Sequence, residues 1–371
     1  MLVPIFLRGG ADGLNMAVPH GDAEYYALRR TLAIPRPGRG PNAALDLDGR
    51  FGLHPALAAW HPLYREGRLA VLHAVGRERN TRSHFEEQDA WETARPNELR
   101  ADGWLNRYLA LHDGSGPIRA ISIGGDLPRI LQGAVPVQAV RRLEELRLQT
   151  GNDREARTTT ALRGAYAAAG GALADRGAEA LEALRVLGAI DPARYVPAPN
   201  ARYPEGDLAQ QLRQAAQLIK ADIGLEVLEL ELGGWDTHQN QGAVDGEHAR
   251  LMRTLAEAVA AFVRDLEALA TEILVVTVSE FGRTAAENGT LGTDHGHGNC
   301  VFAVGAGLAG GQVHGRWPGL ARAALHEGRD LVHTTDYRAV IRDVLVHHMG
   351  CPDIASVLPR WSGPSTGLFR A

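Results

Sequence analysis

Two histidines and an aspartate lie close together in residues 292–298, which read GTDHGHG. Imidazole and carboxylate groups are natural ligands of zinc, manganese or iron, and glycines let the backbone bend so that neighbouring side chains converge on one ion. The segment therefore predicts a metal site built from Asp294, His295 and His297. A polar turn with no ion is the alternative interpretation.

A second pair of this kind, Asp236 and His238, follows the predicted strand at residues 225–232. Ligands in open α/β sheets bind beyond the carboxyl ends of the parallel strands, so residues that follow different strands meet at one edge. We therefore expect this pair to join the 292–298 segment at a shared ion. A helix cap with a hydrogen-bonded histidine would have the same sequence.

Two further carboxylates follow predicted strands. Asp12 lies in the sequence GADG at residues 10–13, which is also a favourable turn. Glu280 directly follows the apolar residues 273–278, and a charge there needs a partner if it is buried. We expect both as metal ligands, with a turn at Asp12 and a salt bridge from Glu280 to Arg283 as the alternatives.

Ser83 lies between Arg82 and His84, just before a predicted helix. Glu86 follows three residues later, which is the pattern of a capping box. The start of a helix also stabilises an anion, so a nucleophilic serine and a capping serine are compatible.

The elements that must position these residues alternate between strand-like and helix-like segments. We expect strands at 2–8, 69–75, 118–123, 225–232, 272–279 and 300–305, and helices at 55–66, 86–93, 104–112, 208–221, 248–269 and 335–348. This order predicts an α/β fold in which a mainly parallel sheet is flanked by helices. We expect one domain over residues 1–371.

The alternation stops between residues 141 and 205. Residues 141–190 carry Ala, Leu, Arg and Glu at helical spacing, and residues 191–204 contain four prolines. We therefore expect a helical insertion or cap at 141–205, ending in a surface connection.

Composition excludes several classes of protein. The formal net charge of -5 provides no strong field for nucleic acid or an anionic membrane. No run approaches the roughly 20 apolar residues that cross a bilayer, and residues 2–7 read as a first core strand instead of a targeting signal. Two cysteines are too few for a disulfide framework.

Four segments in order give the chain a family resemblance. Residues 7–15 read LRGGADGLN, residues 82–85 RSHF, residues 233–238 GGWDTH, and residues 279–284 SEFGRT, followed by the 292–298 segment. Together they resemble the bacterial domain-of-unknown-function family fifteen hundred and one, over residues 2 to about 350. That family is grouped with the alkaline phosphatase and sulfatase superfamily, so the resemblance implies an alkaline phosphatase-like fold. It also implies twin-arginine export to the periplasm, although the chain shows no such signal.

The resemblance also implies roles for individual residues. Asp12 matches a metal ligand, and Ser83 matches the nucleophile, with Thr81 as its substitute. Further ligands would come from Asp236, His238, Glu280, and His295 or His297. The chain departs from the superfamily at Phe281, where a metal-binding histidine is expected, and it lacks the formylglycine pattern of ordinary sulfatases.

These observations predict a metal-dependent hydrolase that acts on phosphate or sulfate esters of small molecules or glycans. A zinc or manganese ion, with calcium or magnesium as further options, would activate Ser83 or a water molecule. Arg82 and Arg283 would neutralise the anionic oxygens, and His84 would carry a proton. The alternative is a catalytically degenerate scaffold protein of the same fold that binds a metal or an anion. The sequence leaves the substrate and the oligomeric state open.

Overall fold

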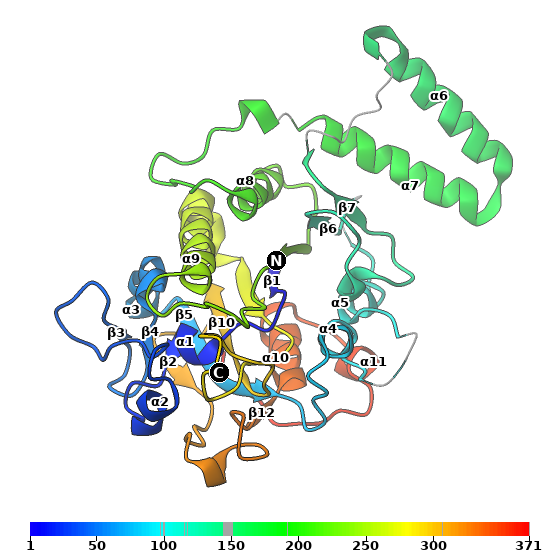
Figure 1. Cartoon of the computed structure of the whole chain (residues 1–371). Coiled ribbons are helices and arrows are strands. Elements are labelled where there is room, and N and C mark those ends of the chain that lie inside the picture. Colours follow the sequence, from blue (N-terminus) through cyan, green and yellow to red (C-terminus); the bar gives the residue numbers. More distant parts are fainter. Residues whose placement is uncertain are drawn as a thin grey trace.

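The computed structural model of the chain describes residues 1–96, 98, 101–114, 116, 118–143, 151–190, 192–305 and 307–370. A nine-stranded sheet lies at its centre (Figure 1). Eight strands follow the order β11-β5-β10-β9-β1-β8-β6-β7, and β12 pairs with β5. The strands are β1 (Leu2–Leu7), β5 (Leu69–Gly76), β6 (Ala120–Ile123), β7 (Gln138–Val140), β8 (Val227–Leu232), β9 (Leu274–Val278), β10 (Asn299–Gly305), β11 (Val313–His314) and β12 (Thr335–Asp336).

The described pairings are parallel apart from those of β10, which is antiparallel to both β5 and β9. The predicted α/β class with a mainly parallel sheet is therefore confirmed. Strand β1 pairs with β8 on one side and β9 on the other, so segments more than 200 residues apart in the chain become neighbours.

Helices cover both faces of the sheet, which makes β1 apolar on both sides. Val3, Ile5 and Leu7 pack against one set of elements, whereas Leu2 and Phe6 pack against another. The first set is η1 (Pro55–Trp60), α3 (His61–Arg65), α8 (Asp207–Lys220) and α9 (Glu247–Leu266). The second is α4 (His84–Thr93), α5 (Trp104–Leu109), η2 (Arg129–Leu131), α10 (Tyr337–Asp343), η7 (Val344–His348) and α11 (Ile354–Val357).

Two predicted helices are wrong in detail. Residues 55–66 form a 3₁₀ helix followed by a short α-helix, because Pro55 and Pro62 each lie at the start of a helical segment and lack a backbone N–H. Residues 335–348 begin as strand β12 and become helical only at Tyr337, because the Asp336 side chain caps that helix by accepting the backbone N–H of Arg338.

A small antiparallel sheet lies beside β5, where the ring of His73 bonds to the carbonyl of Ala17 at 2.8 Å. It contains β2 (Ala17–Val18), β4 (Gly52–Leu53) and β3 (Leu45–Asp46) in that order. Helices α1 (Gly13–Met16) and α2 (Ala23–Leu28) belong to the same region of the chain.

Two helices project from the body past β6 and β7 (Figure 1): α6 (Gly151–Ala169) and α7 (Gly171–Gly188). They fall within the expected insertion, of which residues 144–150 and 191 lie outside the described residues. Glycines at 170 and 171, with φ of 67° and 56°, make the turn between them. Among the described residues, no helix is long and apolar enough to cross a membrane.

Candidate metal centre

Loops that follow β1, β8 and β9 meet at one edge of the sheet, because these three parallel strands are neighbours. Close packing of the loops requires glycine at residue 9, whose φ is 121°. A side chain there would place its Cβ 2.6 Å from the backbone nitrogen of Asp236. The first loop is thereby pressed against the segment that carries Asp236 and His238.

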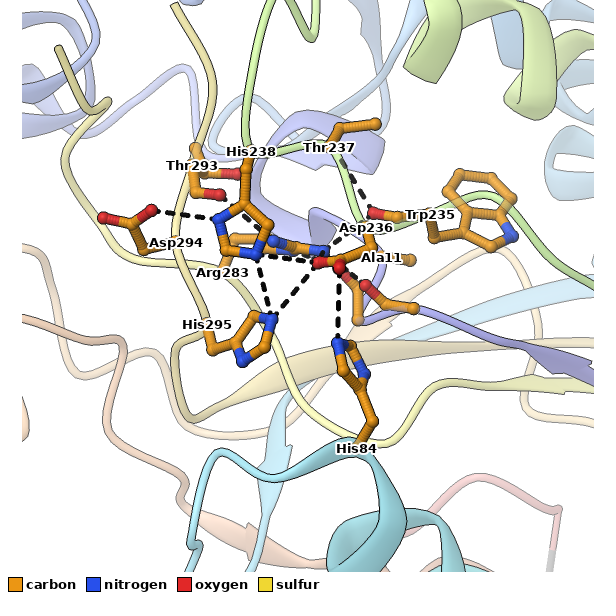
Figure 2. Close-up of polar contacts among 12 residues, drawn as sticks. Ala11, His84, Trp235, Asp236, Thr237, His238, Arg283, Thr293, Asp294 and His295 are labelled. Atoms are coloured by element: carbon orange, nitrogen blue, oxygen red, sulfur yellow. Dashed lines mark hydrogen bonds and ion pairs between the residues drawn. The ribbon is translucent and has the colours of Figure 1, made fainter. Parts of the chain in front are cut away.

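Three imidazoles converge on the Asp236 carboxylate (Figure 2). His238 Nε2 lies 2.9 Å and His295 Nε2 3.2 Å from Asp236 Oδ1. His84 Nε2 lies 3.5 Å from the other carboxylate oxygen, and the two Nε2 atoms of His238 and His295 are 3.0 Å apart. The chelating atoms of His84, Asp236 and His295 all lie within 4.8 Å of one another.

The opposite ring nitrogen of each histidine faces an acceptor. His84 Nδ1 lies 2.7 Å from Glu280 Oε1, and His238 Nδ1 lies 3.0 Å from Asp294 Oδ1. His295 Nδ1 donates to the backbone carbonyl of Arg82 at 2.8 Å. A carboxylate or a carbonyl accepts hydrogen bonds, so each of these contacts suits a proton on Nδ1. In that tautomer the Nε2 lone pair of each ring faces Asp236.

This donor set fits a divalent cation. If His238 and His295 both carry their proton on Nδ1, their Nε2 lone pairs lie 3.0 Å apart and repel each other unless a positive charge lies between them. Ligand atoms of a tetrahedral zinc site with bonds of about 2.0–2.1 Å lie about 3.3–3.4 Å apart, close to the separations seen around Asp236. The Asp236 side chain is 46% exposed, so one side of the cluster is open to solvent.

Among the ligands, the pKa shifts of His295 and Asp236 suit metal binding, whereas that of His84 opposes it. Burial lowers the pKa of His295, which favours the neutral ring that binds metals. Burial of Asp236 opposes its ionisation, yet the Arg283 guanidinium holds its pKa below the ordinary value. The hydrogen bond from Asn288, followed by that from His238, lowers the pKa of Asp294. The hydrogen bond to Glu280 raises the pKa of His84.

Glu280 orients His84, and its oxygens are already occupied. Oε1 accepts from Gly9 N at 2.9 Å, from Gln88 Nε2 at 2.9 Å and from His84, while Oε2 accepts from the Ser279 hydroxyl at 3.0 Å. Glu280 was expected as a metal ligand, but it contacts the Nδ1 side of the His84 ring and not the Nε2 side that faces Asp236. The alternative, a salt bridge to Arg283, is absent among the described residues.

Arg283 is buried and joins the loops together. Nε donates to the carbonyl of Gly10 at 2.5 Å, and Nη1 donates to the carbonyl of Thr293 at 3.0 Å. Nη2 donates to the carbonyls of Gly9 and Trp235 and lies 2.6 Å from Asp236 Oδ1. The guanidinium therefore fixes Asp236 and does not face solvent.

Two expected ligands lie elsewhere. Asp12 is fully buried and pairs with Arg29 Nη1 at 2.5 Å and with Gln241 Nε2 at 2.7 Å. Burial opposes its ionisation, but Arg29 holds its pKa below the ordinary value. His297 contacts His333, with 2.7 Å between His297 Nε2 and His333 Nδ1, so neither Asp12 nor His297 joins the cluster around Asp236.

The two residues before α4, Arg82 and Ser83, differ in their contacts. The Arg82 guanidinium binds Asp330 and Glu327, while its carbonyl faces His295. Ser83 is the N-cap of α4, yet its side chain makes no capping bond. Sequence reasoning missed Asp330 and Gln88. The spacing of four residues between His84 and Gln88 on one helix face was a usable signal for the second.

Comparison with known proteins gives a family and distant structural likenesses. No curated protein matches the chain. Two solved structures of the C-terminal periplasmic domain of EcEptC from Escherichia coli, one a complex with Zn, resemble it at 10% identity. Both matches cover 98% of this chain and 87% of that one, with TM-scores of 0.43 and 0.42. The model of the family described as "Protein of unknown function (DUF1501)" matches residues 54–358, so the chain belongs to this family of unknown function.

Proposed function

We propose that the protein is a metal-dependent hydrolase of phosphate or sulfate esters. The observation that carries the proposal is the convergence of three imidazole Nε2 atoms on the Asp236 carboxylate, each with its Nδ1 tied to an acceptor. Asp236, His84, His238 and His295 would hold the ion, and nitrogen-rich ligation favours zinc or manganese over calcium or magnesium.

When bound, such an ion would polarise an ester oxygen as a Lewis acid and would lower the pKa of a water molecule taken up as a further ligand beside the four protein donors. The chain supplies orientation. Glu280, Asp294 and the Arg82 carbonyl hold the three rings, and Arg283 holds the carboxylate. Solvent access at Asp236 leaves room for a small-molecule or glycan ester to approach.

Charge for the anionic oxygens is expected from the start of α4. Arg82 and Arg283 are both engaged by protein acceptors, so neither guanidinium is free for a substrate. The ten-residue helix α4 begins at His84, and Ser83 leaves its first N–H groups without a side-chain cap. The positive end of the helix dipole therefore lies beside the metal ligands and favours an anion.

The attacking group is either Ser83 or a water molecule, and we propose water. Among the described residues, no group lies within hydrogen-bonding distance of the Ser83 hydroxyl to take its proton. The Thr81 hydroxyl, the other candidate, donates to Glu87 Oε1 at 3.0 Å. The periplasmic location implied by the family resemblance remains a prediction.

Elemental analysis followed by an activity panel tests the proposal. We expect about one zinc or manganese per chain, because the donor atoms surround one position, and turnover of either aryl phosphates or aryl sulfates. Asp236→Ala should lose both properties, whereas the exposed Asp245→Ala should keep them. Metal without turnover would favour the degenerate scaffold protein, and absence of metal would refute the proposal.

A further inference from the structure

His295 is held at two points by neighbouring arginines. Its Nδ1 donates to the main-chain carbonyl of Arg82 at 2.8 Å, and its own carbonyl accepts from Arg329 Nη2. Nε2 of the same ring lies 3.2 Å from Asp236 Oδ1, so the shorter contact is the one at Nδ1. Because a carbonyl only accepts, that contact favours the tautomer with the proton on Nδ1, in which the Nε2 lone pair faces Asp236.

The Arg82 carbonyl can face His295 only because Arg82 adopts an unusual backbone conformation. Its φ is 59°, in the left-handed region that residues with a Cβ avoid. Such a conformation persists when the surroundings impose it, and it occurs often at functional sites. Asn80 contributes by accepting the Arg82 backbone N–H at 2.8 Å, but that contact leaves the side chain unconstrained.

Asp330 constrains the side chain. Its Oδ2 accepts from Arg82 Nε at 2.9 Å and from Arg82 Nη2 at 2.7 Å, and the carboxylate is fully buried. A buried carboxylate must keep its cationic partner, so this pair is fixed in one geometry. Arg329 Nε lies 3.2 Å from the other oxygen, so Asp330 lies between the two arginines that grip His295.

We propose that Asp330 is a positioning residue for His295: by anchoring Arg82, it holds the Arg82 carbonyl against Nδ1 and thereby presents Nε2 to the metal site. The inference rests on the proposed function in one respect: Nε2 of His295 needs this orientation only if it binds a metal ion. The tautomer of His295 is a property of the metal-free chain and can be measured without any activity.

The test uses imidazole ¹⁵N NMR of the metal-free full chain at about pH 8, where a histidine of ordinary pKa near 6.5 is neutral. The His295 signals are assigned by their loss in His295→Gln. We expect protonated Nδ1 in the wild type and a mixture of tautomers in Asp330→Asn. Zinc affinity, measured by calorimetry, should fall roughly 10–100-fold, as is usual for residues behind a ligand.

Glu327→Gln is the matched control, because Glu327 binds the same guanidinium from an exposed position. It should change neither the tautomer nor zinc affinity. If Asp330→Asn does not fold, Arg82→Gly replaces it, because glycine accepts the positive φ while losing the anchored side chain; it should also release His295.

A folded Asp330→Asn or Arg82→Gly chain that keeps His295 protonated on Nδ1 would overturn the inference. If the wild type binds no zinc, the proposed function fails, and the tautomer change alone still decides the role of Asp330.

Discussion

Replacing Ser83 by alanine tests whether its hydroxyl caps α4 or attacks the substrate. Its hydroxyl does not cap α4, so Ser83→Ala should change the free energy of unfolding by less than the roughly 0.5–2 kcal/mol lost with a working cap. With water as the attacking group, kcat should also stay within about twofold, since less than 0.5 kcal/mol of barrier is at stake. Urea denaturation and steady-state kinetics check both. Loss of turnover with metal still bound would make Ser83 the nucleophile.

Arg283 is expected to stabilise the loops through the planar shape of its guanidinium and not through its charge alone. Arg283→Lys keeps a positive charge but replaces a planar fork with a point charge, so most of the bonds to the loop carbonyls are lost. We expect the free energy of unfolding to fall by about 1–3 kcal/mol, because buried carbonyl acceptors lose their donors, and zinc binding to weaken. Arg250→Lys on the exposed face of α9 is the control in the same denaturation series. Equal stability of the two variants would contradict this prediction.

The histidines and aspartates of the sequence motifs predicted some of the residues in the candidate metal centre. Asp236, His238 and His295 lie together, whereas Asp294 contacts the opposite side of the His238 ring, and their role as metal ligands stays a prediction. His297 does not join them, because a two-residue spacing does not fix direction in a glycine-rich loop, and Gly296 packs against the Arg283 carbonyl. Asp12 was misplaced because its partner, Arg29, belongs to the segment after α2, and no local pattern links the two.

At the scale of elements, one carboxylate fastens a long connection to a helix. Asp265 on α9 is fully buried and accepts from Lys220 Nζ, from the hydroxyls of Tyr195 and Tyr203, and from Ala198 N, each at 2.8 Å. Asp265→Asn should lower the free energy of unfolding by about 2–3 kcal/mol, because charge-assisted hydrogen bonds weaken. The exposed Glu257→Gln on the same helix should have no effect.

The same carboxylate gives a pH dependence. Burial opposes its ionisation, but Lys220 and the other donors hold the pKa of Asp265 below its ordinary value. A depressed folded pKa adds stability above the unfolded pKa of about 3.9, and that stability is lost as the pH falls through the folded pKa. The difference in the free energy of unfolding between wild type and Asp265→Asn should therefore be largest at neutral pH and should disappear in acid. A difference that persists below both pKa values would point to packing instead.

Strands with long apolar runs were predictable from the sequence. The direction in which a strand pairs with its neighbours was not. Strands β1, β5 and β9 follow from uninterrupted buried residues. The antiparallel direction of β10 was not predictable, because hydrophobic pattern is the same in both directions and partner choice depends on contacts distant in sequence.

At the scale of the molecule, the centre exists only when the sheet is complete. His84 begins α4 after β5, whereas Asp236 follows β8 and His295 lies between β9 and β10, so strands on both sides of β1 contribute to the centre. We propose that α6 and α7 are an insertion in this fold, because they project from its body beyond β6 and β7 (Figure 1).

Metal binding should therefore stabilise the entire fold. An ion that binds only the folded chain adds RT ln(1 + [L]/Kd), about 2.7 kcal/mol when free metal is 100 times Kd. For a chain of this size each kcal/mol raises the melting temperature by roughly 2 °C, so zinc should raise that of metal-stripped protein by about 5 °C. Asp236→Ala should show no increase and Asp245→Ala the full one, measured by differential scanning calorimetry. An equal increase in both variants would mean that zinc binds away from Asp236, and the centre described around that carboxylate would not be the metal site.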